Sequence, residues 1–225
     1  MSDLSLNDQF AALHAERVRS WPPEQLARNV EQRRKLVDAF DPQAVVQVQA
    51  GDTIAPFALD AADGGTLTRD ALLRQGPAVL IFFRFAGCPA CNLALPYYDR
   101  TLRPALDAAG IRLIAVSPHR VEKGLGEIAT RHGLGFPVAA DRDNRLARSL
   151  GLSFARGEVP AGQPTPGWIG ELTGTETAEL PQPAVILIDG DHVVRFVAVS
   201  PDWLVRTETP EILAAVERLQ LRAAA

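Results

Sequence analysis

Residues 78–92 read AVLIFFRFAGCPACN, and this stretch decides the fold. Residues 78–85 are almost entirely apolar, which predicts a central strand that is buried on both faces. Two residues separate this strand from Cys88, and a helix is predicted from about residue 89 to residue 109. Pro89 suits the first helical turn, because the backbone N–H that it lacks would have no partner there. The stretch therefore predicts a strand, a Cys-x-x-Cys motif and a helix in direct succession.

Alternating strand and helix signals continue on both sides of this unit. They predict further strands and helices over residues 56–59, 66–67, 70–74, 111–117, 121–132, 137–140 and 144–150. The chain ends in a predicted hairpin over residues 184–199 and a helix that begins at Thr209 and Pro210. This order predicts an α/β fold with a mixed central sheet flanked by helices on both faces. Residues 153–183, which are rich in Gly, Pro and Thr, predict a long loop or lid over a site.

Residues 1–49 differ from the rest of the chain in the spacing of their apolar residues. Their apolar residues recur at helical spacing and are interrupted by Trp-Pro-Pro at residues 21–23, which predicts two short amphipathic helices. The sequence therefore predicts a helical N-terminal extension over residues 1–49 and a single domain over residues 50–225. The helical hairpin is expected to lie against this domain or against a partner subunit, and the second arrangement corresponds to a homodimer.

The composition excludes several classes of protein and partner. The chain has 225 residues, 47% of them hydrophobic and 22% charged, which excludes collagen-like, coiled-coil and disordered chains. A net charge of −4 argues against a nucleic acid as partner. The longest apolar run, residues 78–83, is too short for a membrane span, which needs about 20 residues. The N-terminus lacks the basic start and apolar stretch of a secretory signal, so a cytoplasmic location without a membrane partner is expected.

Cys88 and Cys91 are the only cysteines in the chain. In a reducing compartment, such a closely spaced pair is seldom a structural disulfide and indicates redox chemistry or metal binding. A structural zinc site needs four ligands, and neither His119 nor His132 has a second histidine at the required spacing, so no metal or other cofactor is expected. A thiolate at a helix N-terminus is stabilised by unpaired N–H groups and by the helix dipole. Cys88 is therefore predicted to attack and Cys91 to resolve, with a pair of buried structural cysteines as the alternative.

The strand–CPAC–helix unit resembles thioredoxin, which also carries a proline at the position of Pro96. Residues 50–152 more closely resemble the alkyl hydroperoxide reductase C/thiol-specific antioxidant (AhpC/TSA) family, the peroxiredoxins, and residues 183–196 resemble its terminal hairpin. The motifs that carry the resemblance are GDTIAPFAL, DGG, FFRFAGCPAC, IRLIAVS, ADRDNRLARSLGL and PAVILIDGDHVVRF. A subgroup of peroxiredoxin-like proteins has a CPxCN element after a strand end that contains arginine, as residues 84–92 do here. Over residues 50–220, the resemblance implies a thioredoxin-like fold and an antioxidant thiol oxidoreductase.

Two parts of the site depart from the peroxiredoxin pattern. The family usually reads PxxxTxxC before the peroxide-attacking cysteine, and here Ile81 and Phe85 stand at the proline and threonine positions. The family's second arginine aligns with Pro183, where thioredoxins place a cis-proline beside the disulfide, so the bond from Gln182 to Pro183 is a candidate cis bond. The resemblance thus implies a peroxiredoxin frame with thioredoxin-like chemistry, in which Phe85 and Pro183 lie beside the substrate.

Arg84 and His119 complete the candidate site. Arg84 lies four residues before the first cysteine and is expected either to stabilise its thiolate or to face solvent at the strand end. His119 follows the strand over residues 111–117, at the sheet edge where α/β sites collect, and is expected either to bind substrate or to lie in a surface loop. Trp168 and Trp203 are expected either to pack in the core or to shape a pocket.

These features predict reduction of hydroperoxides through a dithiol–disulfide cycle of Cys88 and Cys91. A hydroperoxide would oxidise Cys88 to a sulfenic acid, Cys91 would condense with it, and thioredoxin or a low-molecular-weight thiol would reduce the disulfide. One alternative is a thioredoxin-like protein disulfide reductase or isomerase, whose substrate is a disulfide. The other is a redox-sensing binding module, in which the helical extension and the long loop form an interaction surface.

Overall fold

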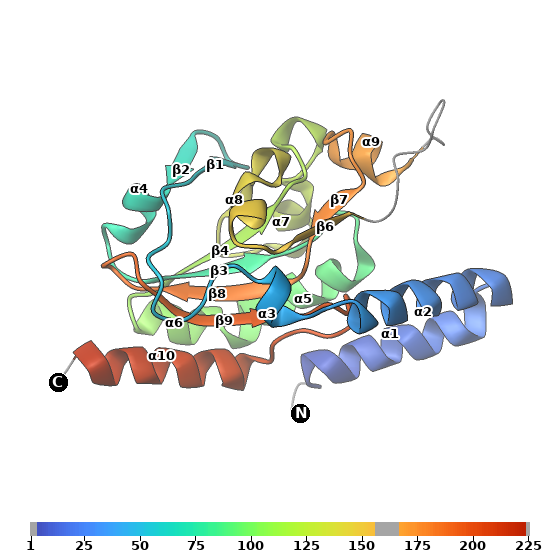
Figure 1. Ribbon diagram of the computed structural model, residues 1–225, viewed down its shortest axis with the longest axis horizontal. Helices are drawn as coiled ribbons and strands as arrows, with labels where there is room; N and C mark the ends of the chain where they lie inside the picture. Colours follow the sequence, from blue (N-terminus) through green and yellow to red (C-terminus); the bar gives the residue numbers. More distant parts are fainter. Residues whose placement is uncertain (1–3, 156–166, 224–225) are drawn as a thin grey trace.

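The strand predicted over residues 78–85 is β3 (Ala78–Phe82), and all five of its residues are buried. The computed structural model describes residues 4–155 and 167–223, and within these ranges β3 belongs to a seven-stranded sheet (Figure 1). The strand order is β2-β1-β5-β4-β3-β8-β9, so β3 has neighbours on both sides. Its buried position explains why the sequence reads as a continuous apolar run instead of an alternating one.

The sheet is mixed, as predicted. Its other strands are β1 (Ala58–Ala61), β2 (Thr66–Thr68), β4 (Arg112–Ser117), β5 (Val138–Ala140), β8 (Ala184–Ile188) and β9 (Val194–Val199). β3 pairs in parallel with β4, and β4 pairs in parallel with β5. β8 pairs antiparallel with both β3 and β9, and β1 pairs antiparallel with β2 and β5. The hairpin predicted over residues 184–199 is therefore confirmed, and β1 and β2 form a second hairpin.

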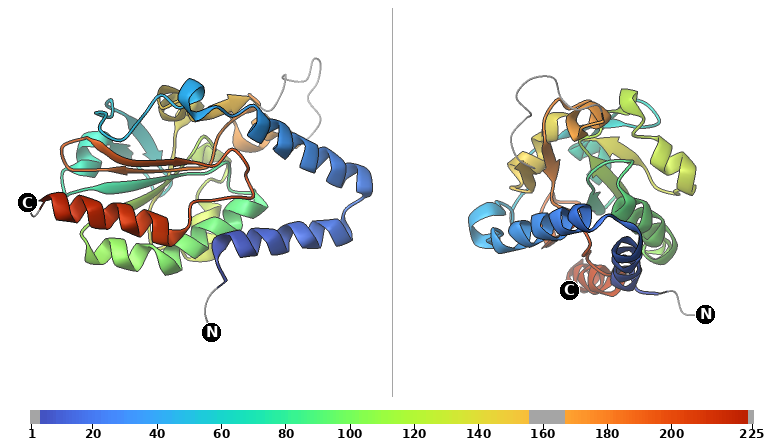
Figure 2. Two further views of the ribbon diagram at one scale, coloured as in Figure 1. Left: turned by 60° about the horizontal axis from the view of Figure 1, so that its bottom comes forward. Right: turned by 90° about the vertical axis from the view of Figure 1, so that its right-hand side faces the viewer.

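Alternate residues of β3 point to opposite faces of the sheet and divide the interior into two cores. Val79 and Ile81 pack in the core of α5, α6 and α10, whereas Leu80 and Phe82 pack in the core of α4 and α8. These helices are α4 (Arg69–Leu73), α5 (Pro89–Thr101), α6 (Arg103–Ala108), α8 (Arg145–Ser149) and α10 (Thr209–Ala223). Figure 2 shows α5, α6 and α10 together on one side of the sheet. The prediction of helices on both faces is therefore confirmed.

Two predicted helices are interrupted where a proline or a glycine stands. The helix predicted over residues 89–109 is divided into α5 and α6, because Pro104 in the first turn of α6 has no N–H with which to continue the helical hydrogen bonds. The helix predicted over residues 121–132 consists of a 3₁₀ turn, η1 (Val121–Lys123), and α7 (Glu127–His132). Gly124, which ends η1, has a φ of +93°, a conformation that other residues rarely adopt.

The prediction of a long irregular loop over residues 153–183 is wrong where the structure describes it. Residues 156–166 lie outside the described residues. On either side of them lie β6 (Ser153–Ala155), α9 (Ile169–Thr173) and β7 (Glu179–Pro181), and β6 pairs antiparallel with β7. Strands of three residues are too short to produce a periodic hydrophobic signal, so the sequence pattern could not reveal them.

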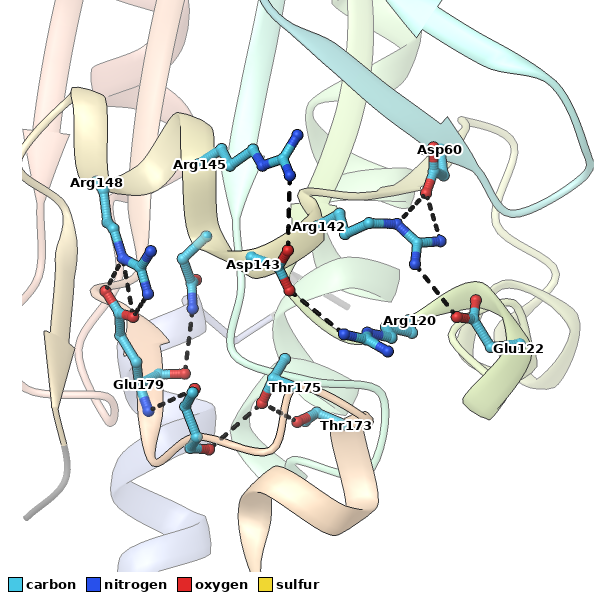
Figure 3. Close-up of polar contacts among 12 residues, drawn as sticks. Asp60, Arg120, Glu122, Arg142, Asp143, Arg145, Arg148, Thr173, Thr175 and Glu179 are labelled. Atoms are coloured by element: carbon cyan, nitrogen blue, oxygen red, sulfur yellow. Dashed lines mark hydrogen bonds and ion pairs between the residues drawn. The ribbon is translucent and has the colours of Figure 1, made fainter. Parts of the chain in front are cut away.

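Polar contacts hold this segment against the rest of the fold (Figure 3). The guanidinium of Arg148 in α8 bonds to the carboxylate of Glu179 in β7. Beside it, Nη2 of Arg120 lies 3.4 Å from Oδ1 of Asp143. The backbone N–H of Arg120 also donates to the carbonyl of Thr173 in α9 (2.9 Å). The described part of the predicted lid is thus anchored to α8 and to the start of η1.

The N-terminal extension forms α1 (Leu6–Ser20) and α2 (Pro23–Asp38), followed by the short α3 (Pro42–Val45). Leu6 and Phe10 of α1 are fully buried in the same core as α5. α1 therefore packs against the sheet domain of its own chain, which is one of the two arrangements expected from the sequence. Among the helices in the described ranges, none is both long and apolar enough to cross a membrane.

Polar contacts also tie the extension to the segment between β9 and α10. The carboxylate of Glu208 accepts hydrogen bonds from the backbone N–H groups of Leu6 (3.1 Å) and Asn7 (2.8 Å) at the start of α1. Arg33 of α2 donates two hydrogen bonds to the carboxylate of Asp202, at 2.7 and 2.6 Å. Both helices of the extension are thus fixed to the C-terminal part of the chain.

Candidate active site

The end of β3 and the start of α5 bring the two cysteines together. Cys88 is the N-cap residue of α5 and Cys91 lies in its first turn, a spacing that suits a disulfide. Both are free thiols, with exposed fractions of 2% for Cys88 and 0% for Cys91. In the described ranges, no His, Asp or Glu joins the cysteines in a group that could hold a metal ion.

The two thiols differ in acidity, because the pKa of Cys88 is lowered and the pKa of Cys91 is raised. A hydrogen bond from the Cys91 thiol lowers the pKa of Cys88 to about 5, against the opposing effect of burial. The positive charges of Arg84 and Arg206 lower the pKa of Cys88 further. Burial, together with the neighbouring Cys88 thiolate, raises the pKa of Cys91 well above its usual range. At neutral pH Cys88 is therefore a thiolate and Cys91 is its hydrogen-bond donor, which is the arrangement that the predicted roles require.

Arg84 is buried, with an exposed fraction of 5%, so the expectation of a solvent-facing arginine at the strand end is wrong. Its guanidinium carbon lies 4.5 Å from the centre of the Trp203 ring and 5.8 Å from that of the Phe85 ring. Aromatic faces stabilise a desolvated cation, which keeps the positive charge of Arg84 close to the thiolate. Trp203 is itself buried, so it packs in the core and forms one wall of the site.

Arg206 is a site residue that sequence reasoning missed. It is buried, and its Nη2 lies 4.0 Å from the Sγ of Cys91. Its Nη1 donates to the carbonyls of Trp203 (2.6 Å) and Val205 (2.8 Å), which fixes the guanidinium in place. Arg206 stands 115 residues after Cys91 in a segment without regular structure, so no local pattern could have predicted the contact.

Arg17 of α1 is a second missed residue. It is buried, and its guanidinium carbon lies 4.7 Å from the centre of the Trp21 ring. Burial lowers the pKa of Arg17, and the negative charge of the Cys88 thiolate opposes this shift. The sequence does hold a signal for Arg17, because it stands seven residues after Phe10 and so on the same, buried face of the helix.

His119 is buried behind the loop that joins β3 to α5, so the expectation of a surface histidine is wrong. Its Nδ1 accepts a hydrogen bond from the backbone N–H of Ala86 (3.2 Å), and its Nε2 bonds to the carbonyl of Lys123 (3.0 Å). Since a carbonyl only accepts, Nε2 carries the proton and the ring is neutral. Burial lowers the pKa of His119, which favours this neutral form. His119 therefore positions the loop that leads to Cys88.

Asn92 and Ser117 hold the same loop. Nδ2 of Asn92 donates to the carbonyls of Ala86 (2.8 Å) and Cys88 (2.9 Å). Oγ of Ser117 donates to the carbonyl of Arg84 (3.1 Å). These bonds fix the backbone on both sides of the reactive sulfur before an oxidant binds, as a preorganised site requires.

Phe85 and Pro183 lie at the same edge of the sheet as the cysteines. Phe85 is half-buried, and Pro183 immediately precedes Ala184, which pairs with Phe82 at the end of β3. In the described part of the chain no peptide bond is cis, so the bond from Gln182 to Pro183, the candidate cis bond, is trans. Pro183 lies between the end of β7 and the start of β8, and its carbonyl accepts a hydrogen bond from the backbone N–H of Ser200 (2.8 Å).

The asymmetry between the thiols predicts selective alkylation of Cys88. Its rate with iodoacetamide should stay nearly constant from pH 6 to 8 and fall about tenfold per pH unit below pH 5, as the thiolate is protonated. Cys91, whose pKa burial raises, should be labelled only well above about pH 8.5, where ordinary thiols ionise. Mass mapping of the protein labelled at pH 6 identifies the site, and labelling of Cys91 before Cys88 would reverse the two roles.

Comparison with solved structures agrees with this fold. Peroxidoxin BcpB of Mycobacterium tuberculosis has a TM-score of 0.60 at 20% identity, and the match covers 78% of this chain and 98% of that one. A mutant of peroxiredoxin 6 of Arenicola marina has a TM-score of 0.62 at 22% identity, covering 78% of this chain and 75% of that one. At such identities the likeness concerns the fold, and it confirms the thioredoxin-like architecture.

Sequence comparison extends the likeness to a family. The curated relative Thiol-disulfide oxidoreductase ResA of Geobacillus thermodenitrificans is 27% identical over 107 residues, or 47% of this chain. The match spans 59% of that relative, less than two thirds of its length. The AhpC/TSA family matches residues 50–197, well over half of the chain, and includes the whole strand–CPAC–helix unit. The chain therefore belongs to the AhpC/TSA family.

Proposed function

We propose that the protein reduces hydroperoxides through a dithiol–disulfide cycle of Cys88 and Cys91. The observation that carries the proposal is the pair of free, buried thiols at the start of α5, with Cys88 at the N-cap and Cys91 in the first turn. A hydrogen bond from Cys91 lowers the pKa of Cys88, which supports the assignment of Cys88 as the nucleophile. Membership of the AhpC/TSA family supports thiol redox chemistry in general. The buried positive charge of Arg84 supports attack on an O–O bond, because negative charge develops on the departing oxygen.

In the first step the Cys88 sulfur attacks the terminal oxygen of the hydroperoxide ROOH. A sulfur–oxygen bond forms, the O–O bond breaks, and the departing alkoxide takes a proton from solvent to give the alcohol ROH. Sulfur loses two electrons and becomes a sulfenic acid, while the hydroperoxide is reduced. Arg84 and the backbone N–H groups at the start of α5 stabilise the charge that moves from sulfur to oxygen.

In the second step Cys91 attacks the sulfur of the Cys88 sulfenic acid. A disulfide bond forms, and hydroxide leaves with the Cys91 proton as water. Two electrons from an external dithiol such as thioredoxin, or from two low-molecular-weight thiols, then return both cysteines to the reduced state. The neutral Cys91 thiol, held against the Cys88 thiolate, needs little movement to make this bond.

Disulfide reduction is a second candidate, and Phe85 favours it. Phe85 stands where the resemblance places a peroxide-binding threonine, and a phenyl ring offers no hydrogen bond to a peroxide. The name of the curated relative, a thiol-disulfide oxidoreductase, supports the same reaction. In it the Cys88 thiolate attacks a disulfide sulfur and releases one thiol, and Cys91 then displaces the second thiol from the mixed disulfide.

Stopped-flow oxidation of the reduced protein distinguishes the two candidates. Hydrogen peroxide, cumene hydroperoxide and bis(2-hydroxyethyl) disulfide are each mixed with the protein, and the fluorescence of Trp203, which packs on Arg84, reports the reaction. We expect cumene hydroperoxide to react about tenfold faster than hydrogen peroxide, because its apolar part can pack against Phe85. Trp203→Phe is the matched control for the origin of the signal.

Two other outcomes would change the assignment. Oxidation by the disulfide alone would replace the proposed function with disulfide reduction. Slow oxidation by all three reagents, together with tight association with a protein partner, would favour the redox-sensing binding module.

A further inference from the structure

Three arginines from distant parts of the chain gather around the Cys88 thiolate. Arg17 comes from α1, Arg84 follows β3 and Arg206 precedes α10, with exposed fractions of 5%, 5% and 6%. The charges of Arg84 and Arg206 act on the pKa of Cys88, and the Cys88 thiolate acts on the pKa of Arg17. Nη2 of Arg206 lies 4.0 Å from Sγ of Cys91, and the guanidinium carbon of Arg206 lies 5.4 Å from the centre of the Phe10 ring in α1. Arg206 also donates to the carbonyl of Trp203, whose ring packs against Arg84.

The carboxylates of this region are engaged elsewhere. Asp202 accepts two short hydrogen bonds from Arg33 of α2 and one from the backbone N–H of Leu204 (2.8 Å). Glu208 accepts hydrogen bonds from the start of α1 and from the hydroxyl of Tyr97 (3.1 Å). Within residues 4–155 and 167–223, the three arginines around Cys88 form no ion pair with an aspartate or glutamate.

The region thus holds an excess of buried positive charge. The charges of three buried guanidinium groups interact with one thiolate, and in the described residues Nη1 of Arg17 and Nε of Arg84 have no hydrogen-bond partner. Buried charges and buried hydrogen-bond donors without partners are unfavourable unless a ligand supplies an opposite charge and hydrogen-bond acceptors. The excess grows when Cys88 is oxidised, because a sulfenic acid and a disulfide are both neutral.

We propose that Arg17, Arg84 and Arg206 form an anion-binding cluster beside Cys88, and that the preferred oxidant is a hydroperoxide that carries a carboxylate. This substrate class deepens the proposed function and rests on it. Guanidinium groups bind carboxylates through charge-assisted, often paired hydrogen bonds. The unpartnered donors of Arg17 and Arg84 are available for such bonds. Because Arg17 belongs to α1, the N-terminal extension contributes to substrate binding as well as to packing.

Two alkylating reagents of nearly equal size test the cluster independently of peroxide reduction. Iodoacetate carries a carboxylate and iodoacetamide is neutral, and both react with the same Cys88 thiolate, so their rate ratio cancels any change in its pKa. For the wild-type protein we expect the ratio of iodoacetate to iodoacetamide to exceed that of free cysteine by about tenfold at low ionic strength. The excess should decrease at high salt, because ions screen the approach of the reagent.

Substitutions assign this excess to the cluster. Arg17→Gln and Arg206→Gln should each lower the ratio of iodoacetate to iodoacetamide by about threefold or more. Arg17→Lys keeps a positive charge and should retain most of the excess in this ratio. Arg19→Gln is the matched control, because it removes an exposed arginine from the same helix and should leave the ratio unchanged. Circular dichroism and thermal melting verify that each variant is folded.

The substrate class is tested with cumene hydroperoxide and its para-carboxylate derivative. We expect the carboxylate to be reduced about tenfold faster, and Arg17→Gln to remove this preference. Equal rates for the two hydroperoxides, with an alkylation ratio equal to that of free cysteine, would overturn the cluster and leave the proposed function intact. Reduction of neither hydroperoxide would overturn the proposed function and this substrate class together, and the alkylation ratio would then decide separately whether the cluster binds anions.

Discussion

Replacement of Cys88 by serine is expected to abolish hydroperoxide reduction, with a loss of at least about a thousandfold in rate. A serine hydroxyl stays protonated at neutral pH, so the nucleophile that attacks the O–O bond is missing. Cys91 cannot take over the attack, because burial raises its pKa and keeps it a thiol. The consumption of cumene hydroperoxide with dithiothreitol as reductant measures the effect.

Cys91→Ser is the matched control for this substitution, since it removes the other thiol of the same helix turn. Its first oxidation should proceed, because the serine hydroxyl can still donate a hydrogen bond to the Cys88 thiolate. The reaction should then stop at a Cys88 sulfenic acid, which dimedone traps for mass spectrometry, or at an intermolecular mixed disulfide. Normal turnover of Cys91→Ser with small thiols would show that Cys88 works alone, and a one-cysteine mechanism would replace the proposed cycle.

The centre of the fold could be predicted because its signals are local. A buried strand leaves a continuous apolar run at residues 78–83, and a proline directly after Cys88 marks the start of a helix. Local signals do not reveal an element that is too short for a periodic pattern, or a helix boundary that depends on a single backbone N–H group. β6 and β7 have three residues each, and the junction of α5 with α6 depends on the missing N–H of Pro104.

The sequence could predict only those residues of the candidate site that lie close to one another along the chain. Cys88 and Cys91 share one motif with Arg84, but the sequence could not decide whether that arginine faces solvent, because its burial depends on Trp203. The position of Arg206 depends on how the segment after β9 folds back over α5, a tertiary contact without a local pattern.

Arg84→Ala is expected to slow hydroperoxide reduction by about a hundredfold to a thousandfold. One part of the loss is the charge that stabilises the departing oxygen. The other part is the thiolate itself, because the charge of Arg84 is among the causes that lower the pKa of Cys88 to about 5. The wild-type rate should therefore be nearly constant from pH 6 to 8, whereas the rate of the variant should rise with pH over this range.

Arg84→Lys separates the charge of this side chain from its packing. A lysine keeps a positive charge near Cys88 but has no planar guanidinium to stack on Trp203, so it should restore most of the rate and a nearly flat pH profile. The second-order rates of both variants with hydrogen peroxide and cumene hydroperoxide, measured at pH 6 and pH 8, provide the comparison. An equal loss in both variants, unchanged between the two pH values, would mean that Arg84 acts through its packing on Trp203 and that its charge has no part in the reaction.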